Sequence, residues 1–243
     1  MGECWAILVA AGSGTRYGSP KQYELLADER VLDRSRRIAQ QCCAGVVVVV
    51  PPEDVAGETA ATVASGRDEG SGYVVAGGST RSESVRAGLA AVPTSATVIC
   101  VHDAARPLAS AALYEAVIDA VLAGADAAVP GVAVSDTIKV VAGGAVVVET
   151  LDRGSLVAVQ TPQAFRAASL RAAHADAGEG TDDAALVERA GGRVVVVPGE
   201  PDNLKITVPD DLDRARALVV ASPDASSAAV VERGVPHGAR GVA

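Results

Sequence analysis

The chain has 243 residues, of which 49% are hydrophobic and 2% are aromatic, so its core has to be built from Val, Ala, Leu and Ile. This length suits one large α/β domain or two small ones, and the hydrophobic content argues against disorder of the chain as a whole. The net charge of −9 argues against non-specific binding to nucleic acid or to an anionic membrane surface, and no apolar run reaches the roughly 18 residues of a membrane span.

Five short runs rich in β-branched residues predict strands that are buried on both faces of a sheet, because they are continuous rather than alternating. In chain order they are Ala6–Val9, Val46–Val50, Val98–Val101, Ala127–Val129 and Arg193–Val197. Apolar residues spaced at three and four predict helices over Val31–Gln41, Arg81–Ala91, Leu113–Ala123, Leu170–Ala177 and Asp182–Ala190. This alternation predicts an α/β fold with a doubly wound, mostly parallel sheet.

One segment interrupts the alternation. Two β-rich runs, Thr137–Val141 and Ala145–Thr150, flank Gly143 and Gly144, and a Gly-Gly turn between such runs is typical of a hairpin. We expect a β-hairpin arm, over about residues 135–155, that projects from the sheet and packs on something, such as another subunit. From Ser222 onward the composition is small, polar and rich in glycine, so residues 222–243 are predicted to be a flexible tail.

The first loop, VAAGSGTRYGSPKQY, follows the first predicted strand. It fits neither the dinucleotide pattern nor the P-loop, since both need glycine where Tyr17 stands. Gly12 and Gly14 nevertheless permit close approach of a ligand to the backbone, and Arg16 and Lys21 add two positive charges. Because ligands bind at the carboxyl ends of strands in such sheets, we favour a phosphate site over an ordinary turn with solvated basic residues.

The segment VHDAARP ends another predicted strand in Asp103. A carboxylate there could ligate Mg²⁺, which prefers a few carboxylates together with phosphate oxygens, or it could simply cap a helix. The preceding His102 is expected to have a packing role, since neighbours on a strand point to opposite sides.

Three further polar turns contribute candidate residues. In GGSTRSESV, Ser84 or the loop backbone could contact a ligand, or the turn could be a plain helix cap. Lys205 lies in DNLKITVPDDL, ahead of a helix that proline initiates. QTPQAF and GTDDAAL are weaker polar turns.

The four cysteines, Cys4, Cys42, Cys43 and Cys100, include no C-x-x-C pair, so a zinc site is not expected. Each lies in or beside an apolar run, which favours buried free thiols and a reducing cytoplasm. The acidic start of the chain is unlike a signal peptide.

Taken together, these motifs resemble one family, the 2-C-methyl-D-erythritol 4-phosphate cytidylyltransferases of the non-mevalonate isoprenoid pathway. The match runs in order from Ala6 to about Leu218 and includes AAGSGTR, PKQY, GGSTRSESV, VHDAARP, DTIK, LDR, QTPQAF, TDDA and DNLKIT. The first two are shared with nucleotidyltransferases generally, whereas VHDAARP with DTIK, QTPQ and DNLKIT is much more specific. The resemblance implies one Rossmann-like nucleotidyltransferase domain over residues 1–221.

It also implies a cytoplasmic, Mg²⁺-dependent homodimer that transfers CMP from CTP to 2-C-methyl-D-erythritol 4-phosphate and releases pyrophosphate. The residues that would bind CTP are Ala10, Ala11, Gly12, Gly14, Gly78, Ser79, Ser84, Asp103 and Ala104, with Asp103 also holding the metal. Those that would carry the chemistry are Arg16, Lys21, Arg153 and Lys205. The second substrate would be held by Arg106, Thr137, Arg153, Thr161, Thr181 and Lys205, with Thr137 and Arg153 coming from the partner's arm.

This reaction needs no general base, because the second pKa of a phosphate monoester is about 6 and the nucleophile is already ionised at pH 7. Two alternatives remain at this point. A transferase for another phosphate, such as a sugar 1-phosphate, would share the first loop but has no reason to keep the arm. A regulatory protein with a retired site would have lost Lys21, Asp103 or Lys205, and all three are present.

Overall fold

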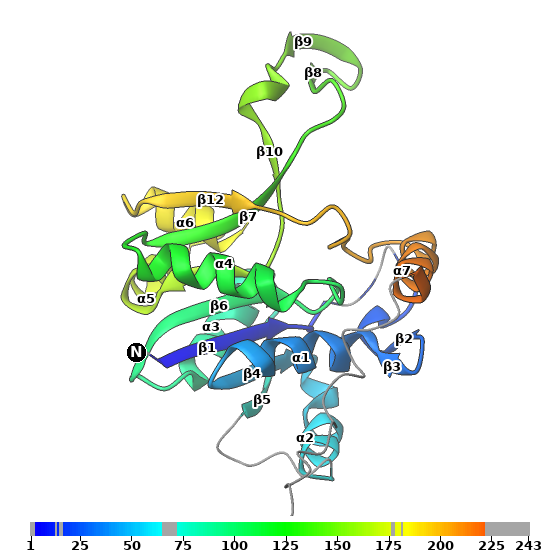
Figure 1. Ribbon diagram of the computed structural model, residues 1–243, viewed down its shortest axis with the longest axis vertical. Coiled ribbons are helices and arrows are strands. Elements are labelled where there is room, and N and C mark those ends of the chain that lie inside the picture. Colours follow the sequence, from blue (N-terminus) through cyan, green and yellow to red (C-terminus); the bar gives the residue numbers. More distant parts are fainter. Residues whose placement is uncertain are drawn as a thin grey trace, which may run out of the picture.

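The computed structural model describes residues 3–12, 14, 17–64, 72–175, 178–180 and 182–221. Within these residues the central element is an eight-stranded sheet in the order β10-β7-β11-β6-β1-β4-β5, with β12 also paired to β7 (Figure 1). Its strands are β1 (Glu3–Val9), β4 (Gly45–Val50), β5 (Gly72–Ala76), β6 (Ala96–Asp103), β7 (Ala127–Ala133), β10 (Val157–Val159), β11 (Gln163–Arg166) and β12 (Val194–Pro198).

Most of the pairings in this sheet are parallel. β5, β4, β1 and β6 run in one direction, and β12 is parallel to β7. β11 is antiparallel to both β6 and β7, and β10 is antiparallel to β7. The carboxyl ends of β1, β4 and β6 therefore meet at one edge of the sheet, and the predicted mostly parallel α/β fold is confirmed.

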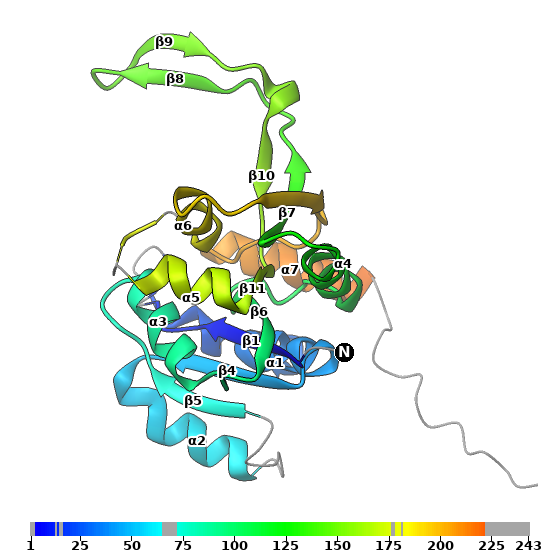
Figure 2. The same cartoon turned by 90° about the vertical axis from the view of Figure 1, so that its left-hand side faces the viewer.

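Helices cover both faces of the sheet. Successive residues of a strand point to opposite sides, so the apolar strands present side chains that must be buried on both faces. Ala6 and Leu8 pack under α1 (Val31–Cys42) and α4 (Ala111–Leu122). Ile7 packs on the other face with α3 (Arg81–Ala91), α5 (Ala167–Ala175) and α6 (Asp183–Arg189). Figure 2 shows α3 and α5 on one side of the strands and α1 and α4 on the other.

Two further helices lie at the periphery. α2 (Val55–Ala64) contacts β5 at the edge of the sheet. α7 (Pro209–Ala221) buries Leu212 and Ala215 against Ile206 and against the small hairpin of β2 (Leu25–Leu26) and β3 (Glu29–Arg30). The helix predicted to start at a proline after Lys205 is thus present, and it holds the Lys205 segment against the body of the protein.

The projecting hairpin is confirmed. β8 (Lys139–Ala142) and β9 (Val146–Thr150) are antiparallel, and the turn between them has positive φ angles at Gly143 (56°) and Gly144 (90°), which suit glycine. The hairpin stands well away from the sheet and is joined to it through β7 and β10 (Figures 1 and 2). Five of its valines are exposed by 38–66%: Val140, Val141, Val146, Val147 and Val148.

The sequence interpretation is wrong for QTPQAF, which was expected to be a polar turn. Gln163–Arg166 is strand β11, inserted between β6 and β7. The Gln163 side chain is buried, and its Nε2 donates to Asp182 Oδ2 at 2.9 Å, which satisfies the donor side of the amide. α2 and β5 were also missed, since one lacks a helical spacing of apolar residues and the other is a short, half-exposed edge strand.

Candidate active site

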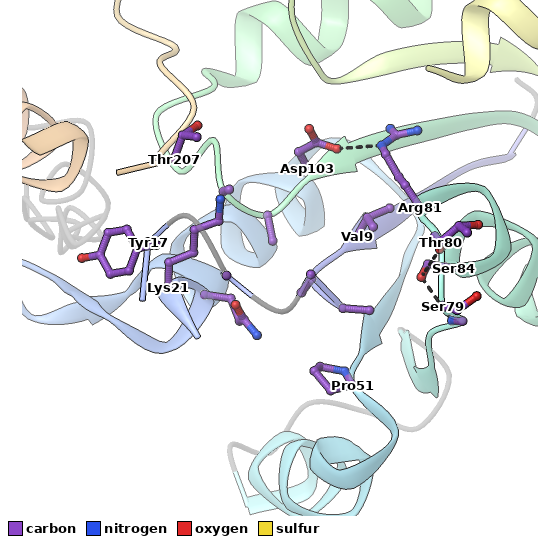
Figure 3. A pocket seen from close by; sticks show the side chains of 18 of the residues that line it. Val9, Tyr17, Lys21, Pro51, Ser79, Thr80, Arg81, Ser84, Asp103 and Thr207 are labelled. Atoms are coloured by element: carbon purple, nitrogen blue, oxygen red, sulfur yellow. Dashed lines mark hydrogen bonds and ion pairs between the residues drawn. The ribbon is translucent and has the colours of Figure 1, made fainter. Parts of the chain in front are cut away.

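A cavity of about 550 Å³ opens at the carboxyl ends of β1, β4 and β6 (Figure 3). Its size is ordinary for a small-molecule site. Lys21 lies toward one end, Ser79 and Ser84 lie toward the other, and Asp103 lies between them (Figure 3). All described residues predicted to contact the nucleotide line it: Ala10, Ala11, Gly12, Gly14, Lys21, Gly78, Ser79, Ser84, Asp103 and Ala104. Arg16 lies outside the described residues.

The first loop is shaped by backbone contacts. Ala10 donates its N–H to Val49 O at 2.8 Å, which ties the start of the loop to β4. Gly14 has φ 64°, and a Cβ there would lie 2.1 Å from Ser19 O, so no other residue fits without a shift. Among the described residues, no atom other than those of its chain neighbours would lie within 4 Å of a Cβ on Gly12, and Gly12 lines the cavity.

The backbone of Ile206 links two lysines that are far apart in the sequence, because it binds Lys21 and directly follows Lys205. Lys21 donates its Nζ to Ile206 O at 2.6 Å, and Ile206 N–H donates to Ala105 O at 2.8 Å. The neighbouring Lys205 forms an ion pair with Asp103, with 2.6 Å between Nζ and Oδ2. The segment after β12, which contains Lys205 and Ile206, therefore packs along the loop after β6. This packing places the amino groups of Lys21 and Lys205 at the cavity wall, where Asp103 also lies.

Asp103 is the centre of a chain of charged groups. Its second oxygen is 3.2 Å from Arg81 Nε, and Arg81 Nη1 is 2.7 Å from the fully buried Asp183. Asp183 in turn lies 3.0 Å from His174 Nε2. Burial opposes ionisation of Asp103, but Arg81 and Lys205 outweigh it and hold the pKa of that carboxyl well below its usual range. Asp103 is therefore an anion whose two oxygens both face cationic groups.

Sequence reasoning did not single out Arg81, Asp183 or His174. Arg81 is the arginine of GGSTRSESV, and Asp183 belongs to GTDDAAL, so each lies inside a motif that the sequence itself shows. Their partnership spans 102 residues and depends on packing of α3 against α5 and on the contact of α5 with α6. Local spacing carries no signal for such a contact.

The turn before α3 is held by its own side chains. Thr80 is the N-cap and forms a capping box with Glu83. Ser84 accepts the Gly78 N–H at 3.2 Å and donates to Thr80 O at 2.9 Å. Ser79 donates both its N–H and its hydroxyl to Glu83, which lowers the pKa of that carboxyl. Ser84 thus shapes the turn and also lines the cavity, so the two interpretations of this motif are compatible.

A second cavity of about 230 Å³ adjoins the first, and the two share Arg81, Asp103 and Lys205 as a common wall. Three of the residues predicted to hold the second substrate line it, namely Arg106, Thr161 and Lys205. Thr181, which was expected here too, lies outside the described residues.

The Thr161 hydroxyl is engaged inside the protein. It accepts the Asp103 N–H at 3.0 Å and lies 3.0 Å from His102 Nδ1. His102 Nε2 faces the carbonyl of Arg106 at 3.1 Å, so this nitrogen must carry the proton and Nδ1 must accept from Thr161. Burial lowers the pKa of His102 to about 4, which keeps the ring neutral at pH 7. Thr161 and His102 therefore fix the backbone that carries Asp103.

The two arm residues of the prediction lie elsewhere. Thr137 and Arg153 are exposed at the base of the arm, and Arg153 Nη1 donates to Ser135 O at 2.5 Å. Neither residue lines either of the two cavities of its own chain.

In the part of the chain that the structure describes, no helix is long and apolar enough to cross a membrane.

Comparison with protein families matches residues 4–221 to IspD, 2-C-methyl-D-erythritol 4-phosphate cytidylyltransferase. The chain is 43% identical over 228 residues to the enzyme of that name from Rubrobacter xylanophilus, covering 91% of this chain and 96% of that one. It is 49% identical over 224 residues to the bifunctional enzyme IspD/IspF of Anaeromyxobacter dehalogenans, covering 88% of this chain and 56% of that protein. The chain thus spans about half the length of the bifunctional relatives it matches.

Solved structures agree with this match. The chain superimposes with a TM-score of 0.78 and 28% identity on the 4-diphosphocytidyl-2C-methyl-D-erythritol synthase of Anaerococcus prevotii, covering 90% of this chain and 99% of that one. The cytidylyltransferase of Thermus thermophilus gives a TM-score of 0.71 at 32% identity, covering 88% and 98%. The expected nucleotidyltransferase fold is thereby confirmed.

Proposed function

Because the chain belongs to the 2-C-methyl-D-erythritol 4-phosphate cytidylyltransferase family, we propose that it transfers CMP from CTP to 2-C-methyl-D-erythritol 4-phosphate. One observation supports this most strongly: a nucleotide-sized cavity and a smaller one share the charged wall of Arg81, Asp103 and Lys205. Two anionic substrates bound in these cavities would meet at that wall. The products are 4-diphosphocytidyl-2-C-methyl-D-erythritol and pyrophosphate.

In the proposed reaction a phosphate oxygen of the second substrate forms a bond to the α-phosphorus of CTP. The bond from that phosphorus to the bridging oxygen of the β-phosphate breaks, and pyrophosphate leaves with the electron pair. The attacking oxygen is already ionised, so the barrier is mainly the approach of one anion to another. Positioning and neutralisation of charge would supply most of the catalysis.

The described residues suit these tasks. Lys21 is held beside the first loop, where it offsets charge that develops on the α-phosphate. Lys205 stands between the two cavities and can turn from Asp103 toward the incoming phosphate, since its side chain is 39% exposed. Arg106 lines the second cavity, and its Nη1 is fixed by Asn203 O at 2.6 Å. Arg16 would add charge at the triphosphate.

We also propose that Asp103 holds a magnesium ion. A single carboxylate beside a triphosphate site is the donor set that Mg²⁺ takes together with phosphate oxygens, so the residues fit the ion. The ion would compete with Lys205 for Oδ2, while Arg81 keeps Oδ1 in place. When bound, it would offset the negative charge of the triphosphate oxygens.

Changing Asp103 to asparagine should weaken Mg²⁺-dependent binding of CTP by at least roughly 10-fold, because an amide is a poorer ligand than a carboxylate. Calorimetric titration of CTP at a series of Mg²⁺ concentrations measures this effect. A thermal melt shows whether the loss of charge next to Arg81 and Lys205 also harms the fold. A folded variant that keeps the parent's Mg²⁺ dependence would contradict the metal assignment.

The arm supports a shared active site. Its exposed valines need a surface that buries them, and a twofold-related copy with the same arm would provide one. Thr137 and Arg153 lie at the base of the arm and outside both cavities of their own chain. We propose that the protein is a homodimer in which these two residues complete the partner's second cavity.

Mixing two inactive chains tests this arrangement. An Arg153→Ala chain and a Lys21→Ala chain should regain activity when their subunits exchange, because one site of the heterodimer receives both defects and the other receives none. The recovered rate per heterodimer should approach about half of the parent's. Each variant treated alone in the same way is the control. Heterodimers that form without regaining activity would place Arg153 in its own chain's site.

The substrate assignment itself is tested by release of pyrophosphate. We expect turnover with CTP and 2-C-methyl-D-erythritol 4-phosphate, and little with other nucleoside triphosphates or with a sugar 1-phosphate. Turnover of the sugar phosphate instead would favour a different nucleotidyltransferase. Binding of CTP without turnover of any acceptor would favour a regulatory protein.

A further inference from the structure

Three cysteines from different parts of the chain gather on the α1 and α4 face of the sheet. Cys4 is near the start of β1, Cys43 follows α1, and Cys100 lies within β6. The Cys4 sulfur is 3.5 Å from that of Cys43 and 3.9 Å from that of Cys100, and all three lie within 4.8 Å of one another. The active-site cavity follows the opposite end of β1, so this cluster belongs to neither of the two cavities described above.

The backbone brings Cys4 and Cys43 together rigidly. The residue after Cys43 donates its N–H to Cys4 O at 2.8 Å, just where β4 begins to pair with β1. Cys43 N–H is itself fixed to Ala39 O at 2.9 Å. A disulfide needs the two sulfurs about 2 Å apart, which a small adjustment of side chains from 3.5 Å can supply.

Cys100 is placed less well for a bond to Cys4. In the register of β1 and β6, Cys4 is opposite Val98, and Cys100 is opposite Ala6. An offset of two residues between neighbouring strands separates Cα atoms by about 8 Å, beyond the about 7 Å that a disulfide spans. The geometry thus selects Cys43 as the partner of Cys4 and leaves Cys100 as a neighbouring thiol.

The cluster also distinguishes the three thiols chemically. Hydrogen bonding with the Cys100 and Cys43 thiols lowers the pKa of Cys4 below its usual range, against the effect of burial. The pKa of Cys43 and that of Cys100 are raised. Cys4 is partly exposed, whereas Cys100 is buried. A thiol of lowered pKa in a partly exposed residue, next to a second thiol of raised pKa, is the arrangement found in cysteines that respond to oxidants.

We propose that Cys4 and Cys43 form a reversible redox pair. Hydrogen peroxide oxidises the Cys4 sulfur, as its thiolate, to a sulfenic acid, with cleavage of the O–O bond and release of hydroxide. The Cys43 sulfur then attacks the Cys4 sulfur, and the sulfenic oxygen leaves as water with the Cys43 proton. The two thiols supply the two electrons that reduce the peroxide, and a dithiol reductant restores both. The bond would join the start of β1 to the end of α1.

Cys42 provides a matched control. It is adjacent to Cys43 in the sequence, but its sulfur faces Ala111 O at 3.9 Å, toward α4. Burial raises the pKa of Cys42 to about 11, so it stays protonated. A Cys42→Ser variant therefore changes the same residue type at the neighbouring position and leaves the proposed pair intact.

The experiment treats the reduced full chain with hydrogen peroxide in a buffer that contains a metal chelator, and then blocks free thiols under denaturing conditions. Mass spectrometry should find that two of the four cysteines are protected, in a peptide that links Cys4 to Cys43. Dithiothreitol should reduce the link and restore both cysteines as free thiols. The Cys42→Ser chain should behave like the parent, whereas Cys43→Ser should lose the linked peptide and retain a sulfenic acid at Cys4 that dimedone traps.

Three outcomes would overturn the proposal. All four thiols could remain reactive after excess peroxide, the linked peptide could contain Cys42, or Cys4 could proceed to the sulfinic acid without forming any link. A thermal melt of the reduced Cys43→Ser chain shows whether it is folded. If it is not, the parent and the Cys42→Ser chain alone decide the matter through the identity of the linked residues.

Discussion

Replacing Lys21 by alanine should lower kcat by roughly 10²–10³-fold and raise the KM for CTP far less. The Lys21 amino group is fixed at the cavity wall by Ile206 O, 2.6 Å away, so it is already positioned when charge develops on the α-phosphate. A contact that strengthens on the way to the transition state acts mainly on kcat. Steady-state kinetics with pyrophosphate release measures both parameters.

The contact with Ile206 also gives Lys21 a structural role, so two controls are needed. Lys21→Met keeps most of the apolar stem and removes the charge, and it should lose kcat as much as the alanine variant does. Arg214→Ala removes an exposed cation of α7 that lines neither cavity, and it should leave kcat nearly unchanged. Near-normal turnover of a folded Lys21→Ala protein would exclude Lys21 from the chemistry.

Replacing Asp183 by alanine should lower the free energy of unfolding by about 3–5 kcal/mol. The Asp183 carboxylate is fully buried, and it is the partner of both Arg81 and His174. Its removal leaves the inner end of the Arg81 guanidinium without a counter-charge in a buried place, and the desolvation of that charge is no longer offset. The melting temperature should fall by roughly 6–20 °C, as measured by thermal unfolding.

A surface pair of the same chemistry supplies the comparison. Asp213 is 74% exposed and lies 2.9 Å from Arg216 in α7. Asp213→Ala should change stability by at most about 0.5 kcal/mol, since water screens an exposed ion pair and solvates the partner that is left. Equal losses of unfolding free energy in the Asp183 and Asp213 variants would show that the buried ion pairs of Asp183 stabilise the fold no more than an exposed pair does. Asp183→Asn should lie between them, because an amide keeps one oxygen that accepts a hydrogen bond.

Much of this protein follows from local patterns in the sequence. Runs such as Val46–Val50 are apolar throughout because both faces of their strand are covered, and that pattern is visible without a structure. Gly143 and Gly144 predict the hairpin because its tight turn needs two positive φ angles. The order of short motifs, from the first loop to DNLKIT, was sufficient to identify the family.

The tertiary structure decided which residues from distant parts of the sequence come into contact. Strand β11 was hidden because Gln163 is polar, and the partner of its buried amide nitrogen, Asp182, lies 19 residues further along the chain. The ion pairs of Lys205 with Asp103 and of Arg81 with Asp183 each join residues about 100 positions apart. The cysteine cluster likewise joins residues from three separate elements. Such contacts are set by the order of strands in the sheet and by which helices cover which face. Periodicity reports which face of an element is buried, and it does not report what that face meets.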